Sequence, residues 1–153
     1  MALLDSDHTL NEAPERYLVS LGINDLPHVW KVLEPLLVKA CEESRGEFSV
    51  PMILENMGLN TGVERWRIMA IIHHGSVQAA MVVCISQVGE RRVLDCLLAT
   101  GENAKEWPLV DDEFDAFARE YGCESVRIPC ARKGWLKALP HWRMRGYVLE
   151  REI

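Results

Sequence analysis

The stretch "RWRIMAIIHHGSVQAAMVVCISQVGERRVLDCLLAT" (residues 65–100) contains three successive runs that are rich in β-branched and apolar residues. Such runs favour strands. The polar breaks "HHGS" and "VGER" between them have the length of hairpin turns. The sequence therefore predicts three antiparallel strands over residues 65–73, 77–87 and 91–99, paired in sequence order. Much of each run is apolar on both faces, so we expect helices on both sides of the sheet.

Helical patterns lie on either side of these strands. Upstream, apolar residues recur at helical spacing from Leu26 to Ala40, and Pro35 is expected to kink or break that helix. Downstream, residues 110–121 form an amphipathic pattern whose start is crowded with acids, as a helix N-terminus favours. The complete expected order is helix 26–40, helix 49–58, the three strands, helix 110–121, strand 124–130, helix 132–139 and strand 147–153.

Length and composition indicate one globular domain. The chain has 153 residues, 48% hydrophobic and 26% charged, which is typical of a single well-buried core. We expect residues 1–24 to form an arm or an edge strand and residues 25–153 to form the domain. No apolar run is long enough for a bilayer, and the first residues lack the basic start of a signal peptide. Five cysteines without a C-x-x-C pair favour reduced thiols and a cytoplasmic setting.

The net charge of −6 is unevenly distributed. Residues 102–124 carry eight acids and two bases, whereas residues 132–145 carry five bases and no acid. Such blocks belong either to an ordinary solvated surface or to an electrostatic contact with a protein, a nucleic acid or another copy of the chain. The overall acidity disfavours nucleic acid. The interface candidates of the basic segment are Arg132, Lys133, Trp135, Lys137, Trp142, Arg143 and Arg145.

The order of expected elements resembles the GNAT acetyltransferase family, from about residue 26 to the C-terminus. The closest local similarity is "WRMRGY" (residues 142–147), where family members often have Tyr-x-x-x-Gly-Phe. The ending "RKGW…LP…W…RG" is also similar to that of small GNAT-like proteins encoded by tailed phages. The resemblance implies an α/β (α+β) fold, in which helices flank a central twisted mixed sheet that contains the antiparallel meander. It also implies chemistry with acetyl-coenzyme A. If the chain is phage-encoded, the protein is expected in the host cytoplasm or in the virion.

The segment that would hold the cofactor departs from the family pattern. The family signature Arg/Gln-x-x-Gly-x-Gly/Ala binds the pyrophosphate through backbone N–H groups at a helix N-terminus. Here the segment is "LLATGENAKEWPLVDDEF", with one glycine, two glutamates and a proline that removes an N–H group. We therefore expect no cofactor; in an active enzyme, the loop residues would be Thr100, Gly101, Glu102, Asn103 and Ala104.

Catalytic groups are also missing from the expected places. Trp142 replaces the Tyr whose hydroxyl would protonate the leaving thiolate, and an indole N–H cannot do so. Asp95, on the third strand, is a weak candidate for a general base, and a strand Asp with a solvated or bonded side chain is the preferred interpretation. We therefore expect no catalytic residue.

Cysteine and metal chemistry are not expected either. Cys96 and Cys130 lie in apolar surroundings, without a His placed by a motif to activate them, so both are interpreted as core thiols. Neighbouring residues on a strand point to opposite faces, so His73 and His74 should not bind one ion together. No common zinc pattern matches the cysteine spacings.

Three hypotheses for function follow. The favoured one is a non-catalytic GNAT-like interaction or structural protein, in a tailed-phage particle or its assembly, with protein partners such as phage structural proteins or itself. The alternative is a divergent N-acetyltransferase that uses acetyl-coenzyme A. The third is a nucleic-acid binder that uses residues 132–145. Fold alone does not decide between them.

Overall fold

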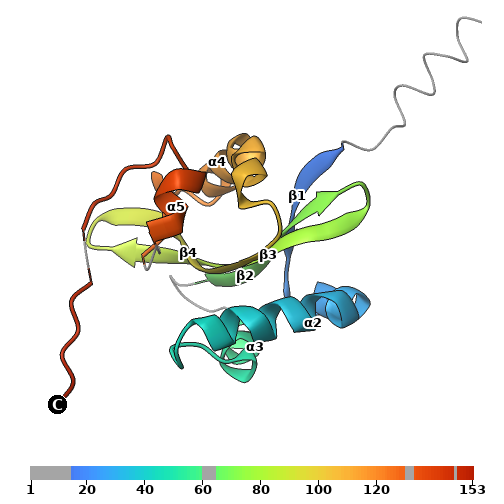
Figure 1. Cartoon of the computed structure of the whole chain (residues 1–153), viewed down its shortest axis with the longest axis horizontal. Helices are drawn as coiled ribbons and strands as arrows, with labels where there is room; N and C mark the ends of the chain where they lie inside the picture. Colours follow the sequence, from blue (N-terminus) through green and yellow to red (C-terminus); the bar gives the residue numbers. More distant parts are fainter. Residues whose placement is uncertain (1–14, 60–64, 130–132, 147) are drawn as a thin grey trace, which may run out of the picture.

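The computed structural model describes residues 15–59, 65–129, 133–146 and 148–153. Its centre is a five-stranded mixed sheet with the strand order β1-β2-β3-β4-β5. In Figure 1 the sheet lies between α2 and α3 below and α4 and α5 above. Neighbouring strands are antiparallel from β1 to β4, and β5 is parallel to β4. The strands are β1 (Arg16–Leu21), β2 (Arg65–His73), β3 (Ser76–Val88), β4 (Arg91–Gly101) and β5 (Ser125–Arg127).

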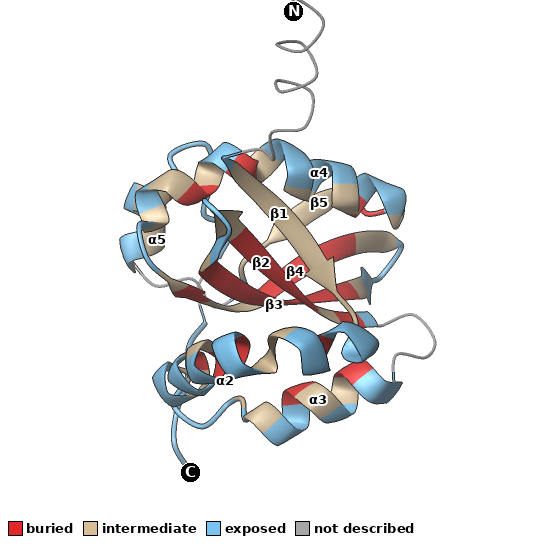
Figure 2. Ribbon diagram, turned by 90° about the vertical axis from the view of Figure 1, so that its right-hand side faces the viewer, coloured by how far each residue is buried: buried red, intermediate tan, exposed pale blue. Residues whose placement is uncertain are grey.

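Helices cover both faces of this sheet (Figure 2). One face packs against α2 (Leu26–Glu43), which follows the short η1 (Ile23–Asp25), and against α3 (Val50–Leu59). The other face packs against η2 (Ala104–Val110), α4 (Asp111–Glu120) and α5 (Lys133–Ala138). No helix in the described ranges is long and apolar enough to cross a membrane.

Alternation of the side chains along the meander strands produces two hydrophobic cores. Ile68 and Val82 belong to the core under α2 and α3, while Met69 and Met81 belong to the core under α4 and η2. All four side chains are at most 4% exposed. Because successive strand residues point to opposite faces, a run that is apolar throughout becomes a strand buried on both sides, as expected from the sequence.

The structure confirms the meander and its pairing, and it changes three other expectations. Of the kink or break expected at Pro35, the break is absent: α2 runs on to Glu43, because its packing outweighs one lost backbone hydrogen bond. The strand expected over 124–130 is limited to Ser125–Arg127, since its path diverges from β4. The expected last strand is absent from the described residues 148–153. The neighbouring strand β5 offers only three residues for pairing, and Leu149 and Ile153 are fully exposed instead.

Candidate functional site: a cleft beside β4

Strand β4 separates from β5 halfway along its length. The two strands pair only over Val93, Leu94 and Asp95. On the β3 side, Val82 pairs with Leu98 and Val83 with Cys96, which leaves Leu97 as the extra residue of a β-bulge. Bulges frequently lie where pairing ends next to a functional site. Among the described residues, β4 therefore has no strand neighbour on its β5 side from Cys96 to its end.

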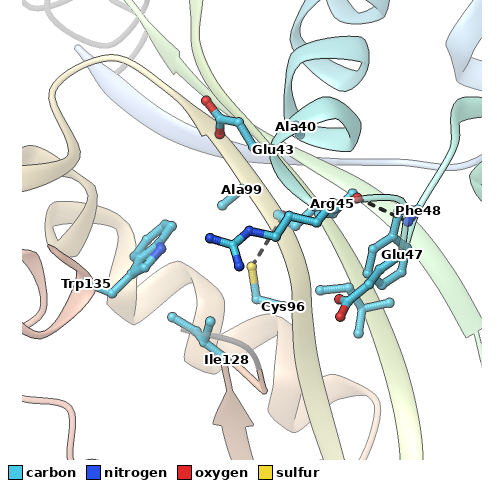
Figure 3. A pocket seen from close by; sticks show the side chains of 12 residues that line it. Ala40, Glu43, Arg45, Glu47, Phe48, Cys96, Ala99, Ile128 and Trp135 are labelled. Carbon is cyan, nitrogen blue, oxygen red and sulfur yellow. Dashed lines mark hydrogen bonds between the residues drawn. The ribbon is translucent and has the colours of Figure 1, made fainter. Parts of the chain in front are cut away.

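A cleft of about 330 Å³ opens at this point. One wall is β4, the second comes from the loop between α2 and α3, and the third is formed by Ile128 and Trp135. The guanidinium group of Arg45 reaches into the cleft toward Trp135, with Cys96 below it (Figure 3). The loop holds Arg45 there through two consecutive left-handed residues, Arg45 at φ 57° and Gly46 at φ 85°.

Sequence reasoning missed these loop residues. The available signal was the charged tract "EESRGE" (residues 42–47) between two apolar helical patterns. Glu43, Arg45 and Glu47 of this segment line the cleft, together with the following Phe48. A charged loop is usually only a solvated connection, so its position opposite β4 required the tertiary fold.

The loop expected to contact a cofactor is folded against the sheet. Gly101, at φ 147°, crosses β3 so closely that a Cβ atom would lie 2.5 Å from the Cα atom of Ala79. The backbone N–H of Glu102 donates to the carbonyl of Gln78 at 3.0 Å. Among the other loop candidates, Thr100 is buried and Asn103 adopts a left-handed conformation. Close packing against β3 therefore requires a glycine at this position.

The next residues, in η2, are engaged by the protein itself. Glu106 accepts hydrogen bonds from Arg16 at 2.7 Å and from Gln78 at 3.0 Å. Trp107 is buried, its indole N–H donates to the carbonyl of Glu102 at 2.8 Å, and its ring lies 5.2 Å from that of Trp135. A second hollow beside these rings measures about 40 Å³, which corresponds to roughly three water molecules.

The N-terminus of α4 is surrounded by the chain's own acids. Asp111, Asp112 and Glu113 occupy its first turn. Burial raises the pKa of Asp111, and a hydrogen bond from Trp142 opposes that shift. Glu113 accepts a hydrogen bond from the backbone N–H of Leu18 at 2.7 Å. Because carboxylates already occupy the positive end of the helix dipole, a second anion would meet like charge there.

The candidate base Asp95 has a structural partner. Its two carboxylate oxygens accept hydrogen bonds from Arg127 at 2.7 and 2.8 Å, and its side chain is 8% exposed. Asp95 therefore has the bonded partner that the preferred interpretation names. The adjacent thiol of Cys96 is buried, and burial, with the Asp95 charge as a second cause, raises its pKa to about 12. Cys96 is a core thiol, whereas Cys130 lies outside the described residues.

The basic segment divides into an inward and an outward part. Trp135 and Trp142 are half-buried and line the smaller hollow, and Trp135 also lines the cleft. Lys137, Arg143 and Arg145 are exposed, and no ion pair joins them to any acid that the structure describes. Arg132 and the side chain of Lys133 lie outside the described part of the chain.

The premise that His73 and His74 lie on one strand and point to opposite faces was wrong. His74 is not on the strand: it is the first turn residue after β2 and has a left-handed φ of 49°. This conformation returns its side chain toward His73, and the ring centroids lie 4.2 Å apart. Together with Glu15, the two residues could hold a metal ion. The opposite-face rule failed because it applies only to consecutive residues in extended conformation.

Comparison with solved structures identifies the fold. An aminoglycoside acetyltransferase from an uncultured soil metagenomic sample has a TM-score of 0.59 and 16% identity, covering 91% of this chain and 97% of that one. The ribosomal-protein-alanine N-acetyltransferase of Brucella melitensis has a TM-score of 0.60 and 11% identity, covering 92% of this chain and 99% of that one. An acetyltransferase of Trypanosoma brucei has a TM-score of 0.55 and 13% identity, covering 90% of this chain and 99% of that one. No family model and no curated protein matches the sequence. The chain therefore has the GNAT acetyltransferase fold, in a divergent form.

Proposed function

We propose that this chain is a non-catalytic GNAT-fold protein that acts through contacts with a protein partner. The observation that carries this proposal is the segment between β4 and α4. It is a 3₁₀ helix folded on the sheet, with Glu106 paired internally and acids at the start of α4. A coenzyme A pyrophosphate would need N–H donors and positive charge at this place.

The expected loss of affinity is large. Each charge-assisted hydrogen bond to a phosphate contributes about 1.5–3 kcal/mol. The absence of two or three such bonds would weaken binding by several powers of ten. Repulsion by Asp111 and its neighbours acts in the same direction. The protein should therefore show neither acetyl-coenzyme A binding at useful affinity nor acetyl transfer.

The surface that we assign to the partner contains Lys137, Arg143 and Arg145, with Arg132 and Lys133 on the same segment. Its positive charge fits an acidic protein surface, either a structural protein of a tailed-phage particle or a second copy of this chain. A second copy would offer the exposed acids of α4, namely Asp112, Asp115 and Glu120. Nucleic acid is the less favoured partner, because the chain as a whole carries a charge of −6.

Charge reversal tests the contact between copies. We expect Arg143→Glu with Arg145→Glu to reduce the apparent mass in light scattering at high protein concentration and low salt. The matched control reverses two exposed lysines of α2, Lys31→Glu with Lys39→Glu, and should leave the mass unchanged. If all three proteins associate equally, the basic segment is not the contact between copies. The same variants can then be tested against particle proteins.

A second candidate, a divergent acetyltransferase, is favoured by the cleft itself. The bulge at Leu97, the unpaired end of β4 and the volume of about 330 Å³ provide room for an acyl chain. Glu47 supplies a carboxylate in the lining that could accept a proton from an amine. An assay for thiol release from acetyl-coenzyme A with a panel of amines distinguishes the two candidates: the non-catalytic proposal predicts no release above background.

A further inference from the structure

Three metal-binding side chains converge where β1 begins and β2 turns into β3. The Nε2 atom of His73 lies 3.4 Å from Oε1 of Glu15, and the Nε2 atom of His74 lies 3.2 Å from the same oxygen. All three ligand atoms lie within 4.8 Å of one another. The backbone N–H of His74 donates to the carbonyl of Glu15 at 3.0 Å, which holds the two segments together.

The neighbouring side chains cannot satisfy these three groups at once. The Nη2 atom of Arg16, which only donates, lies 3.2 Å from Nε2 of His73. If that nitrogen has no proton, it accepts from Arg16 but presents a lone pair to the carboxylate of Glu15. If it has a proton, it can donate to Glu15 but opposes the N–H of Arg16. One of its two contacts is therefore always mismatched.

A cation between the three ligands would satisfy His73, His74 and Glu15 at once, in exchange for the contact between Arg16 and His73. The lone pairs of both imidazoles and the carboxylate would then point at one positive centre. Arg16 would keep its hydrogen bonds to Glu106 at 2.7 Å and to Gln78 at 3.0 Å. When both imidazoles are neutral, the carboxylates of Glu15 and Glu106 and the guanidinium of Arg16 give this group of side chains one net negative charge. This charge favours the binding of a cation.

We propose that Glu15, His73 and His74 form a binding site for a borderline divalent transition metal, of which Zn²⁺ is the best fit. Two imidazoles and one carboxylate suit this class of ion rather than Mg²⁺ or Ca²⁺, which prefer oxygen ligands. With bonds of 2.0–2.1 Å, adjacent ligand atoms of a tetrahedral zinc ion lie about 3.3 Å apart. Both carboxylate–imidazole distances are close to this value. The fourth position is available to water or an external ligand.

Metal binding would fasten the edge strand to the meander. Glu15 immediately precedes β1, and His73 is the last residue of β2, paired with Arg16 at the start of β1. An ion that links Glu15 to both histidines would oppose fraying of β1 from this end. The site is independent of the cleft and of the proposed function, so either can fail without the other.

Calorimetry with ZnCl₂ and untagged protein, freed of metal beforehand, tests the proposal. We expect one zinc ion per chain with a micromolar dissociation constant and a zinc-dependent increase in Tm. His74→Asn tolerates the left-handed backbone, and Glu15→Gln keeps the size of the side chain; each should weaken binding at least about tenfold. The matched control, His28→Asn on exposed helix surface, should bind like the original protein. Absence of zinc binding, or equal binding by all variants, would overturn the proposal.

Discussion

The pair of Asp95 and Arg127 links β4 to β5 at the point where the two strands separate, and its removal should cost substantial stability. Arg127 donates two hydrogen bonds to a carboxylate that is 8% exposed, whereas the guanidinium side chain is 34% exposed. The two truncations are therefore unequal. Arg127→Ala leaves a buried charge without a partner, while Asp95→Ala leaves a cation that water can partly solvate.

The free energy of unfolding should decrease by about 3–5 kcal/mol in Arg127→Ala, the usual loss when one partner of a buried pair is removed. Asp95→Ala should lose less, about 1.5–3 kcal/mol. For a chain of this size, a loss of 3 kcal/mol lowers Tm by about 6–12 °C. The double variant should lose less than the sum of the single losses, with a coupling of about 2–3 kcal/mol.

Urea unfolding followed by tryptophan fluorescence measures all four proteins of this double-mutant cycle. Equal m-values would show that the comparison concerns stability and not a change in the unfolded state. A coupling near zero, or an Asp95→Ala variant as stable as the original protein, would refute the structural role of Asp95. A loss of acetyl transfer without a loss of stability would instead identify Asp95 as a base.

One further variant and one labelling reaction test the packing around β4. Gly101→Ala should destabilise the protein by about 3 kcal/mol in urea unfolding, the upper end of the usual cost of overpacking, since its Cβ would lie 2.5 Å from Ala79 Cα. Gly134→Ala, with nothing within 4 Å, is the control and should be neutral or stabilising. At pH 8, iodoacetamide should label Cys41 well before Cys96, because a pKa of about 12 leaves about one thiolate in 10⁴. Equal labelling in peptide mass spectrometry would contradict the burial of Cys96.

The sheet was predictable because its signals are local. Runs that are apolar on both faces, separated by hairpin-length breaks, specify the pairing of β2, β3 and β4 and the two helical layers. The acids at the start of α4 likewise indicated its N-terminus correctly. The last strand was not predictable from propensity, because a strand also requires a neighbour with unpaired backbone groups, and β5 is only three residues long.

The candidate site was only partly predictable. The role of Gly101 depends on the distance between β4 and β3, which the one-dimensional pattern does not contain. The position of Arg45 in the cleft depends on how the α2–α3 loop meets β4. The convergence of His73 and His74 depends on one left-handed residue at a turn. The absence of a second glycine and the excess of acids after β4, in contrast, could be read directly from the sequence.

Calorimetric titration of the purified protein with acetyl-coenzyme A tests the central claim most directly. The acids and the internally bonded η2 segment between β4 and α4 predict no measurable heat of binding, even at millimolar cofactor concentration. Binding with a micromolar dissociation constant would contradict the non-catalytic account and favour a divergent acetyltransferase.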